Sequence, residues 1–256
     1  MPTHDHLITQ EFTRQADAMS TAAHFNDETI LDRICDAAAM TAQSRALDVA
    51  CGPGIVVEAL AKRGGEIMGC DVTPAMLEKA MARARNAGLS NAAFVPGRAE
   101  ALPFEEGYFD VVVSRSAVHH FSDPAAAIRE MTRVLKPGGR CITVDVTSAE
   151  VREDGDLHNA LEIIRDPSHV RMLPRTVLHR CLGEAGLQVD QCVTWVNQRE
   201  FTEWMKIVSA PERIGPLRVV MTALARSGIH AGIGLRLDGE RILFEHTAGM
   251  TVATKR

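Results

Sequence analysis

The 256-residue sequence contains few aromatic residues, which make up 4% of it and include a single Tyr. Its net charge is −5 and it has no dense run of Lys or Arg. Proteins that bind single-stranded nucleic acids stack bases on aromatic side chains inside a basic groove. Because both features are missing, we expect a small-molecule substrate and no nucleic-acid partner.

Further absences narrow the class of protein. No stretch reaches the roughly 18 apolar residues that a membrane span requires, and residues 1–10 lack the apolar core of a signal peptide. The six Cys form no C-x-x-C pair, which is typical of reduced core thiols in a cytoplasmic protein. The chain also lacks H-E-x-x-H, nucleophile-elbow and P-loop lysine motifs. We expect a cytoplasmic protein, monomeric or homodimeric, with no membrane association and no metal site.

Short apolar runs alternate with amphipathic helical segments from residue 46 onward, after two helical segments within residues 1–43. Runs of this kind are typical of strands buried on both faces of a parallel sheet. Thr73-Pro74 and Asp123-Pro124 predict helix starts, and Gly88 predicts a helix end. The pattern predicts an α/β fold, a Rossmann-like doubly wound sheet. Its seven mostly parallel strands are expected at Ala46–Ala50, Ile67–Cys70, Ala93–Val95, Phe109–Ser114, Cys141–Val146, Leu187–Val196 and Met250–Thr254.

The most informative segment is the glycine-bearing loop that follows the first of these strands. It reads Asp48-Val49-Ala50-Cys51-Gly52-Pro53-Gly54, and its glycines allow a ligand to approach the backbone. A dinucleotide-binding loop would need a further glycine at Val57. Asp48 would repel a pyrophosphate but attract an ammonium or sulfonium group. Asp71, at the end of the next strand, can accept hydrogen bonds from both hydroxyls of a ribose.

Six motifs occur in a fixed order between residues 46 and 147. The glycine loop is followed by Asp71–Leu77, Gly97–Phe104, Phe109–Ser114, Ala117–Phe121 and Val134–Gly139. In this order the sequence resembles class I S-adenosylmethionine-dependent methyltransferases, in the small-molecule branch that includes ubiquinone and natural-product methyltransferases. The resemblance implies S-adenosylmethionine (SAM) as cofactor, S-adenosylhomocysteine as product, and methylation of a small organic acceptor at O, N or C.

The resemblance also implies which residues bind the cofactor. Relatives usually have Asp at the position of Arg98, where its carboxylate accepts a hydrogen bond from the adenine amine. Arg only donates hydrogen bonds, so the Ala99 backbone or Glu100 would have to accept that bond instead. The implied set is Asp48, Ala50, Cys51 and Gly52 around the methionine part, Asp71 at the ribose, Val72 and Met76 at the adenine, Arg98, Ala99 and Glu100 along its other edge, Ser114 near the amino group, and Phe12 and Gln15 from the cap.

His119 and Asp145 are the candidate catalytic residues. The His pair at 119 and 120 follows the fourth strand, and Asp145 lies near the end of the fifth, its neighbour in this fold. A His oriented by a carboxylate can act as a base near neutral pH, and relatives that methylate hydroxyl groups have a similarly placed pair. The alternative is that the His pair only positions or caps the turn at Asp123-Pro124.

The same resemblance suggests how one domain of residues 1–256 is divided. Residues 1–43 form a helical cap, 46–147 the cofactor-binding half, and 148–256 complete the sheet with helical insertions at 151–173 and 200–228 over the substrate. Apolar residues such as Met19, Phe25 and Trp204 line a substrate pocket or simply pack the cap. Two other functions remain open at this point: a SAM-binding enzyme that does not methylate, such as a cyclase or decarboxylase, and a non-catalytic pseudo-methyltransferase.

Overall fold

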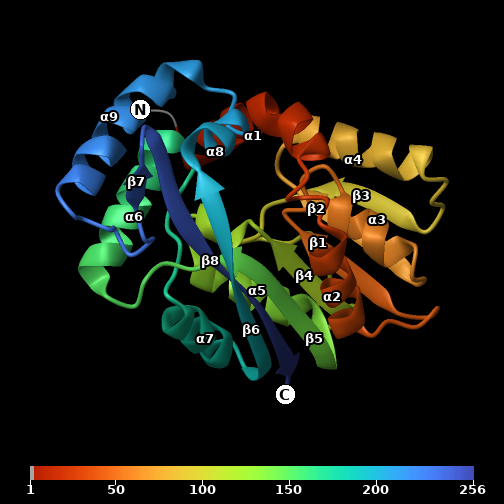
Figure 1. Ribbon diagram of the computed structural model, residues 1–256. Coiled ribbons are helices and arrows are strands. Elements are labelled where there is room, and N and C mark those ends of the chain that lie inside the picture. The colour runs from red at the N-terminus through yellow and green to blue at the C-terminus, as the bar shows by residue number, and fades with distance from the viewer. Residues whose placement is uncertain (1–2) are drawn as a thin grey trace.

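One mixed sheet organises the molecule, in a computed structural model that describes residues 3–256 (Figure 1). Its strands follow the order β3-β2-β1-β4-β5-β8-β6, and a short β7 pairs with β8 outside this path. The first five strands are parallel, and β8 and β6 are antiparallel to their neighbours. The strands are β1 (Arg45–Val49), β2 (Glu66–Asp71), β3 (Ala92–Pro96), β4 (Phe109–Arg115), β5 (Leu135–Val146), β6 (Leu187–Glu200), β7 (Arg236–Asp238) and β8 (Arg241–Lys255).

This architecture confirms the predicted Rossmann-like fold, with seven strands along the main path and the short β7 beside them. Helices cover both faces of the sheet (Figure 1). Those of the parallel half are α2 (Glu28–Ala38), α3 (Ile55–Ala61), α4 (Pro74–Asn86), the single 3-10 turn η1 (Val118–His120) and α5 (Pro124–Val134). The others are α1 (His4–Thr21), α6 (Arg152–Arg165), α7 (Arg175–Glu184), α8 (Phe201–Lys206) and α9 (Pro211–Arg226).

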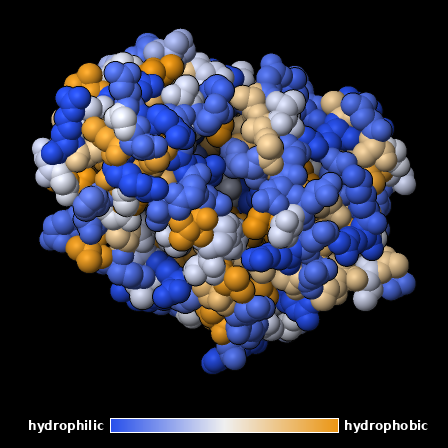
Figure 2. Space-filling model, in the orientation of Figure 1, coloured by the Kyte–Doolittle hydropathy of each residue, from blue (hydrophilic) through white to orange (hydrophobic). Residues whose placement is uncertain are grey.

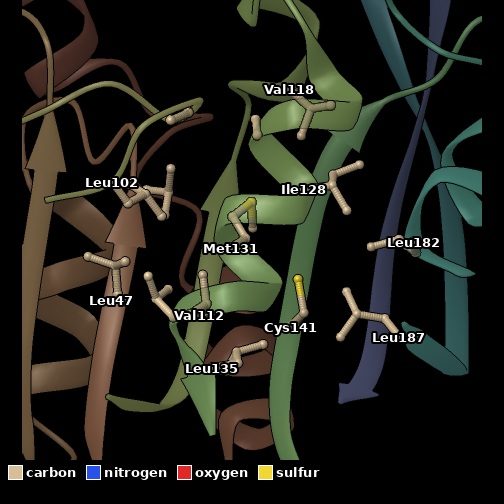
Figure 3. Close-up of a cluster of buried hydrophobic side chains, with 14 of the residues drawn as sticks. Leu47, Leu102, Val112, Val118, Ile128, Met131, Leu135, Cys141, Leu182 and Leu187 are labelled. Carbon is tan, nitrogen blue, oxygen red and sulfur yellow. The ribbon is translucent and has the colours of Figure 1, made fainter. Parts of the chain in front are cut away.

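The central strands are buried on both faces because each face packs against its own helices. Leu47 and Val112 point to the side of α5 and α7, where they join Met131 and Leu182 (Figure 3). Val111 and Val113, the neighbours of Val112, point to the opposite side and pack with α2 and α3. This double burial explains why the strands read as continuous apolar runs rather than alternating ones.

Two strands are longer than predicted, and their extra length builds the cavity described below. β6 and β8 pair as one antiparallel ribbon from Leu187 opposite Lys255 to Glu200 opposite Leu243. The prediction recognised only the apolar part, Met250–Thr254, because the rest of β8 alternates between buried and exposed residues. α8, α9 and β7 pack on the far part of this ribbon in a third core around Phe201 and Phe244.

β5 is also longer than predicted, because it begins at Leu135 and includes Lys136–Gly139 ahead of the predicted Cys141–Val146. The register of β4 and β5 shifts between Phe109 and Val111, so the glycines are absorbed in an irregular stretch of the ladder. The surface in Figure 2 is mostly hydrophilic, with scattered hydrophobic side chains. Within residues 3–256, no helix combines the length and apolar character needed to cross a membrane.

Candidate functional site

The glycine loop lies at the carboxyl end of β1, where the strand order reverses between β1 and β4. Ligands of doubly wound sheets bind at this switch point. Asp71, at the end of β2, fixes the loop: its Oδ2 accepts a hydrogen bond from Gly52 N and its Oδ1 one from Thr73 N, each at 2.8 Å. Gly52 and Gly54 have φ values of +51° and +78°, which glycine adopts without strain. Asp71 and the glycines therefore build one rigid ligand cradle.

The cradle opens into a cavity of about 970 Å³, which we call the first cavity. Helix α1 lies across one side of it, where Ile8 and Phe12 line the cavity. Most residues of the predicted cofactor set line this cavity. They are Phe12, Asp48, Ala50, Cys51, Gly52, Asp71, Val72, Arg98, Ala99 and Glu100.

Three residues of the predicted cofactor set do not line the first cavity. Met76 and Ser114 are buried in the protein interior, 1% and 0% exposed. Gln15 faces a different cavity, where its Nε2 donates a hydrogen bond to Asp166 Oδ2 at 2.8 Å. The resemblance implied that Gln15 of the cap contacts the cofactor, whereas the structure places this side chain in the wall of the other cavity.

Asp48 is a buried carboxyl group on the wall of the first cavity, with no hydrogen bond to any residue of 3–256. Burial and, next, repulsion by Asp71 raise its pKa to about 8. A buried carboxyl group held in this way is stabilised by a cation from outside the protein. The sulfonium and ammonium groups of SAM supply such a cation, so the Asp48 carboxyl group in the wall of the first cavity fits this cofactor.

Arg98 has a structural role that its chemistry alone did not reveal. Its Nη1 forms an ion pair with Asp5 of α1, and its Nη2 lies 3.4 Å from Glu100 Oε2. Glu100 is itself fixed by Ser122, whose N and Oγ donate to Oε1 at 2.9 and 2.8 Å. Arg98 therefore ties helix α1 to the rim of the first cavity.

A second cavity of about 1,050 Å³ adjoins the first. It extends between α1, α6 and α8 and the far part of the β6–β8 ribbon, with apolar walls at Trp195, Trp204 and Ile207. The two cavities have several lining residues in common, which marks the place where they meet. These are Phe12, Met19, Phe25, Arg115, Ser116 and His120.

His119 and Asp145 lie together in the wall of the second cavity, next to this junction. His119 Nδ1 is 2.6 Å from Asp145 Oδ1. The parallel pairing of β4 and β5 brings them together, as the sequence predicted. Burial alone would lower the pKa of His119, but the charge and hydrogen bond of Asp145 outweigh burial and raise that pKa above its ordinary value. His120, buried without such a partner, has its pKa lowered to about 4.

Several residues of the second cavity had no signal in the sequence. Glu162 and His246 come from α6 and β8, and together with His158 they place one ligand atom each within 4.8 Å of the others. His158 and Glu162 are four residues apart on a helix, a spacing that puts them on one face. Neither that spacing nor the alternation in β8 indicates that His246 would join them.

Comparisons with known proteins agree with this geometry. Residues 47–143 match a family model described as a methyltransferase domain. An uncharacterized methyltransferase of Bacillus subtilis, YcgJ, is 32% identical over 200 residues, which are 78% of this chain and 79% of YcgJ. The crystal structure of YcgJ has a TM-score of 0.84 at 30% identity, covering 90% of this chain and 99% of that one. An uncharacterized Escherichia coli protein, YafE, is 33% identical over 68% of this chain and 84% of its own.

The chain belongs to the class I SAM-dependent methyltransferase family. It is therefore an enzyme that uses SAM as its cofactor. Of the functions that the sequence left open, SAM-dependent methylation is the one that the relatives support.

Proposed function

We propose that this enzyme methylates a hydroxyl group of a small organic acceptor, with His119 as the base. The observation that carries the proposal is the 2.6 Å contact between His119 and Asp145 beside the junction of the two cavities. Methyl transfer to an amine that is already neutral needs no base, whereas a hydroxyl group must lose its proton as it attacks. A carboxylate-paired His at this place is best explained by a hydroxyl acceptor.

In this proposal the first cavity holds SAM, through the lining residues predicted from the sequence. Asp48 meets the positive charge of the cofactor, Asp71 accepts hydrogen bonds from the ribose, and Arg98 keeps the cap helix closed over the site. SAM supplies an electrophilic methyl group when bound. Residues 1–43 then serve as the cap, residues 46–147 as the cofactor-binding half, and the helices within 148–256 as the roof over the acceptor.

The second cavity holds the acceptor. Asp145 can only accept a hydrogen bond when ionised, and burial, which would raise its pKa, is outweighed by His119, so that the pKa is lowered. Nδ1 of His119 therefore carries a proton, and Nε2 is left to take the proton of the acceptor hydroxyl. Trp195 and Trp204 exclude water from the apolar part of the cavity, and the protein otherwise acts by positioning the two reactants.

The test is to identify the product. The purified enzyme is incubated with ¹³C-methyl-labelled SAM and a panel of small phenols, aliphatic alcohols and amines. We expect S-adenosylhomocysteine and a methyl ether in equal amounts, with the ether recognised by its carbon shift. A product methylated only on nitrogen or carbon would contradict the assignment of a hydroxyl acceptor.

Binding of SAM should release a proton from Asp48. In the free enzyme the pKa of Asp48 is about 8, so the group is mostly protonated at pH 7. A cation beside it favours the ionised form, and SAM affinity should increase with pH until that pKa is passed. Calorimetry at pH 7 in phosphate and in Tris should give binding heats that differ by the ionisation of the buffer. In the Asp48→Asn variant this difference should disappear; equal heats for the wild-type enzyme would disprove the assignment.

A further inference from the structure

Arg199 is a half-buried arginine whose guanidinium group has no partner among residues 3–256. It lies on β6 in the wall of the second cavity, and its Nε is fully buried with nothing to bond to. Across residues 3–256 it makes no hydrogen bond and no ion pair. Burial and, next, the nearby Arg165 lower the pKa of Arg199. Because buried charges in proteins are normally paired, this cation is positioned for something that the chain itself does not supply.

None of the carboxylates that line the same cavity bonds to Arg199, and each of them has another hydrogen-bond partner. Glu162 is the carboxylate whose charge acts on Arg199. Arg165 donates a hydrogen bond to Oε2 of Glu162 and lies over the Trp204 ring, 4.6 Å from its centroid. The pairs are Asp145 with His119 at 2.6 Å, Glu162 with Arg165 at 3.3 Å, Asp166 with Gln15 at 2.8 Å, and Asp27 with the backbone N of Thr29 at 2.9 Å. None of these pairs involves Arg199, whose guanidinium group is left without a hydrogen-bond or ion-pair partner on this wall.

His246, which forms a cluster with His158 and Glu162 beside Arg199, adds no positive charge. Burial lowers the pKa of His246 to about 4, so this imidazole is neutral at pH 7. Although the three side chains are close enough to share a cation, the guanidinium of Arg165 is bonded to the same carboxylate and Arg199 lies nearby. Because Arg165 already engages this carboxylate and Arg199 adds a positive charge nearby, the cluster is a poor site for a metal ion.

Arg199 lies far along the cavity from the catalytic pair. Asp145 is opposite Gly249 of β8, and Arg199 is opposite Phe244. Five residues of extended strand separate these levels, about 17 Å at ~3.4 Å per residue. Between them Trp195 and Ala248 form an apolar stretch of the wall, and the polar pair Asn197 and His246 lies nearer to Arg199. The wall therefore offers a polar reacting end, an apolar stretch beside it and a polar far end that carries the cation.

We propose that Arg199 binds an anionic group of the acceptor, a carboxylate or a phosphate carried on an apolar body at the end remote from the methylated hydroxyl. This inference rests on the proposed function, in that the second cavity is taken to hold the acceptor. A guanidinium suits both anions, since it donates two parallel hydrogen bonds to a pair of oxygens.

The test measures binding rather than turnover. The enzyme, saturated with S-adenosylhomocysteine, is titrated with 4-phenylbutyrate, phenyl phosphate and the neutral 4-phenylbutyramide. We expect the better of the two anions to bind at least about tenfold more tightly than the amide, and the identity of that anion distinguishes a carboxylate from a phosphate acceptor. Arg199→Gln should reduce the preference to within about twofold, whereas Arg241→Gln, an exposed arginine on β8, should leave it unchanged.

Equal binding of the anions and the amide by the wild-type enzyme, including no binding of either, would overturn the inference. So would an unchanged preference in Arg199→Gln. Thermal unfolding of Arg199→Met gives a second measurement: removal of an uncompensated charge should leave the melting temperature of the ligand-free enzyme unchanged or higher, while a purely structural arginine would lower it. SAM binding by Arg199→Gln should equal that of the wild-type enzyme, and failure of the wild-type enzyme to bind SAM would count against the proposed function instead.

Discussion

Replacement of Asp71 by Asn should weaken SAM binding by about 100-fold or more. Both carboxylate oxygens of Asp71 are engaged by the glycine cradle, through Gly52 N and Thr73 N at 2.8 Å. The same group is the proposed acceptor for the ribose hydroxyls. A hydrogen bond to a charged group contributes about 1.5–3 kcal/mol, and two of them correspond to roughly two to four orders of magnitude in affinity. An Asn side chain also turns an NH₂ group toward one of the two backbone donors.

Calorimetry with SAM measures this effect, and Asp110→Asn is the matched control. Asp110 also accepts a backbone hydrogen bond, from Arg45 N at 2.8 Å, and pairs with Lys136 at 2.7 Å. It lies at the amino end of β4, whereas the cradle lies at the carboxyl ends of the parallel strands. We expect its loss to lower stability slightly and to leave SAM affinity within about twofold. If Asp71→Asn behaved like Asp110→Asn, the assignment of the first cavity to SAM would fail.

Replacement of His119 by Gln should lower kcat for methyl transfer by about 10²–10⁴-fold, the usual contribution of a general base. SAM affinity should change by less than about threefold, because His119 lines the second cavity and not the first. The measurement is release of S-adenosylhomocysteine with a hydroxyl acceptor at saturating concentrations of both substrates. His179→Gln serves as the control, since His179 lies on α7 outside both cavities. A His119→Gln variant with nearly full kcat would show that the His pair only positions the turn that follows.

Most of the residues predicted to bind the cofactor line the first cavity, because the determinants of that part of the fold are local. Strand, glycine loop and helix follow one another within a few residues, and the end of β2 lies beside the end of β1 in any parallel sheet of this kind. Asp48, Gly52 and Asp71 were therefore placed correctly on one cavity. The same logic joined His119 to Asp145 across neighbouring strands.

The acceptor half could not be predicted in this way, since its contacts join residues that are far apart in the chain. Gln15 meets Asp166 across 151 positions, and no periodicity indicates that pairing. Arg199 resembled any polar residue of an outer strand until β6 and β8 were seen to form one long ribbon. What distinguishes it is a missing partner, which only the folded structure can reveal.

The most direct test of the central claim is the pH dependence of kcat/KM for methyl transfer, in the wild-type enzyme and in Asp145→Asn. The base is active when deprotonated, and Asp145 holds the pKa of His119 above its ordinary value. We expect the wild-type rate to rise with pH through an apparent pKa above about 6.5, and the rise to move to lower pH in Asp145→Asn with a smaller plateau. A profile that is flat from pH 5 to 9, or identical in the two enzymes, would contradict the assignment of His119 as the base.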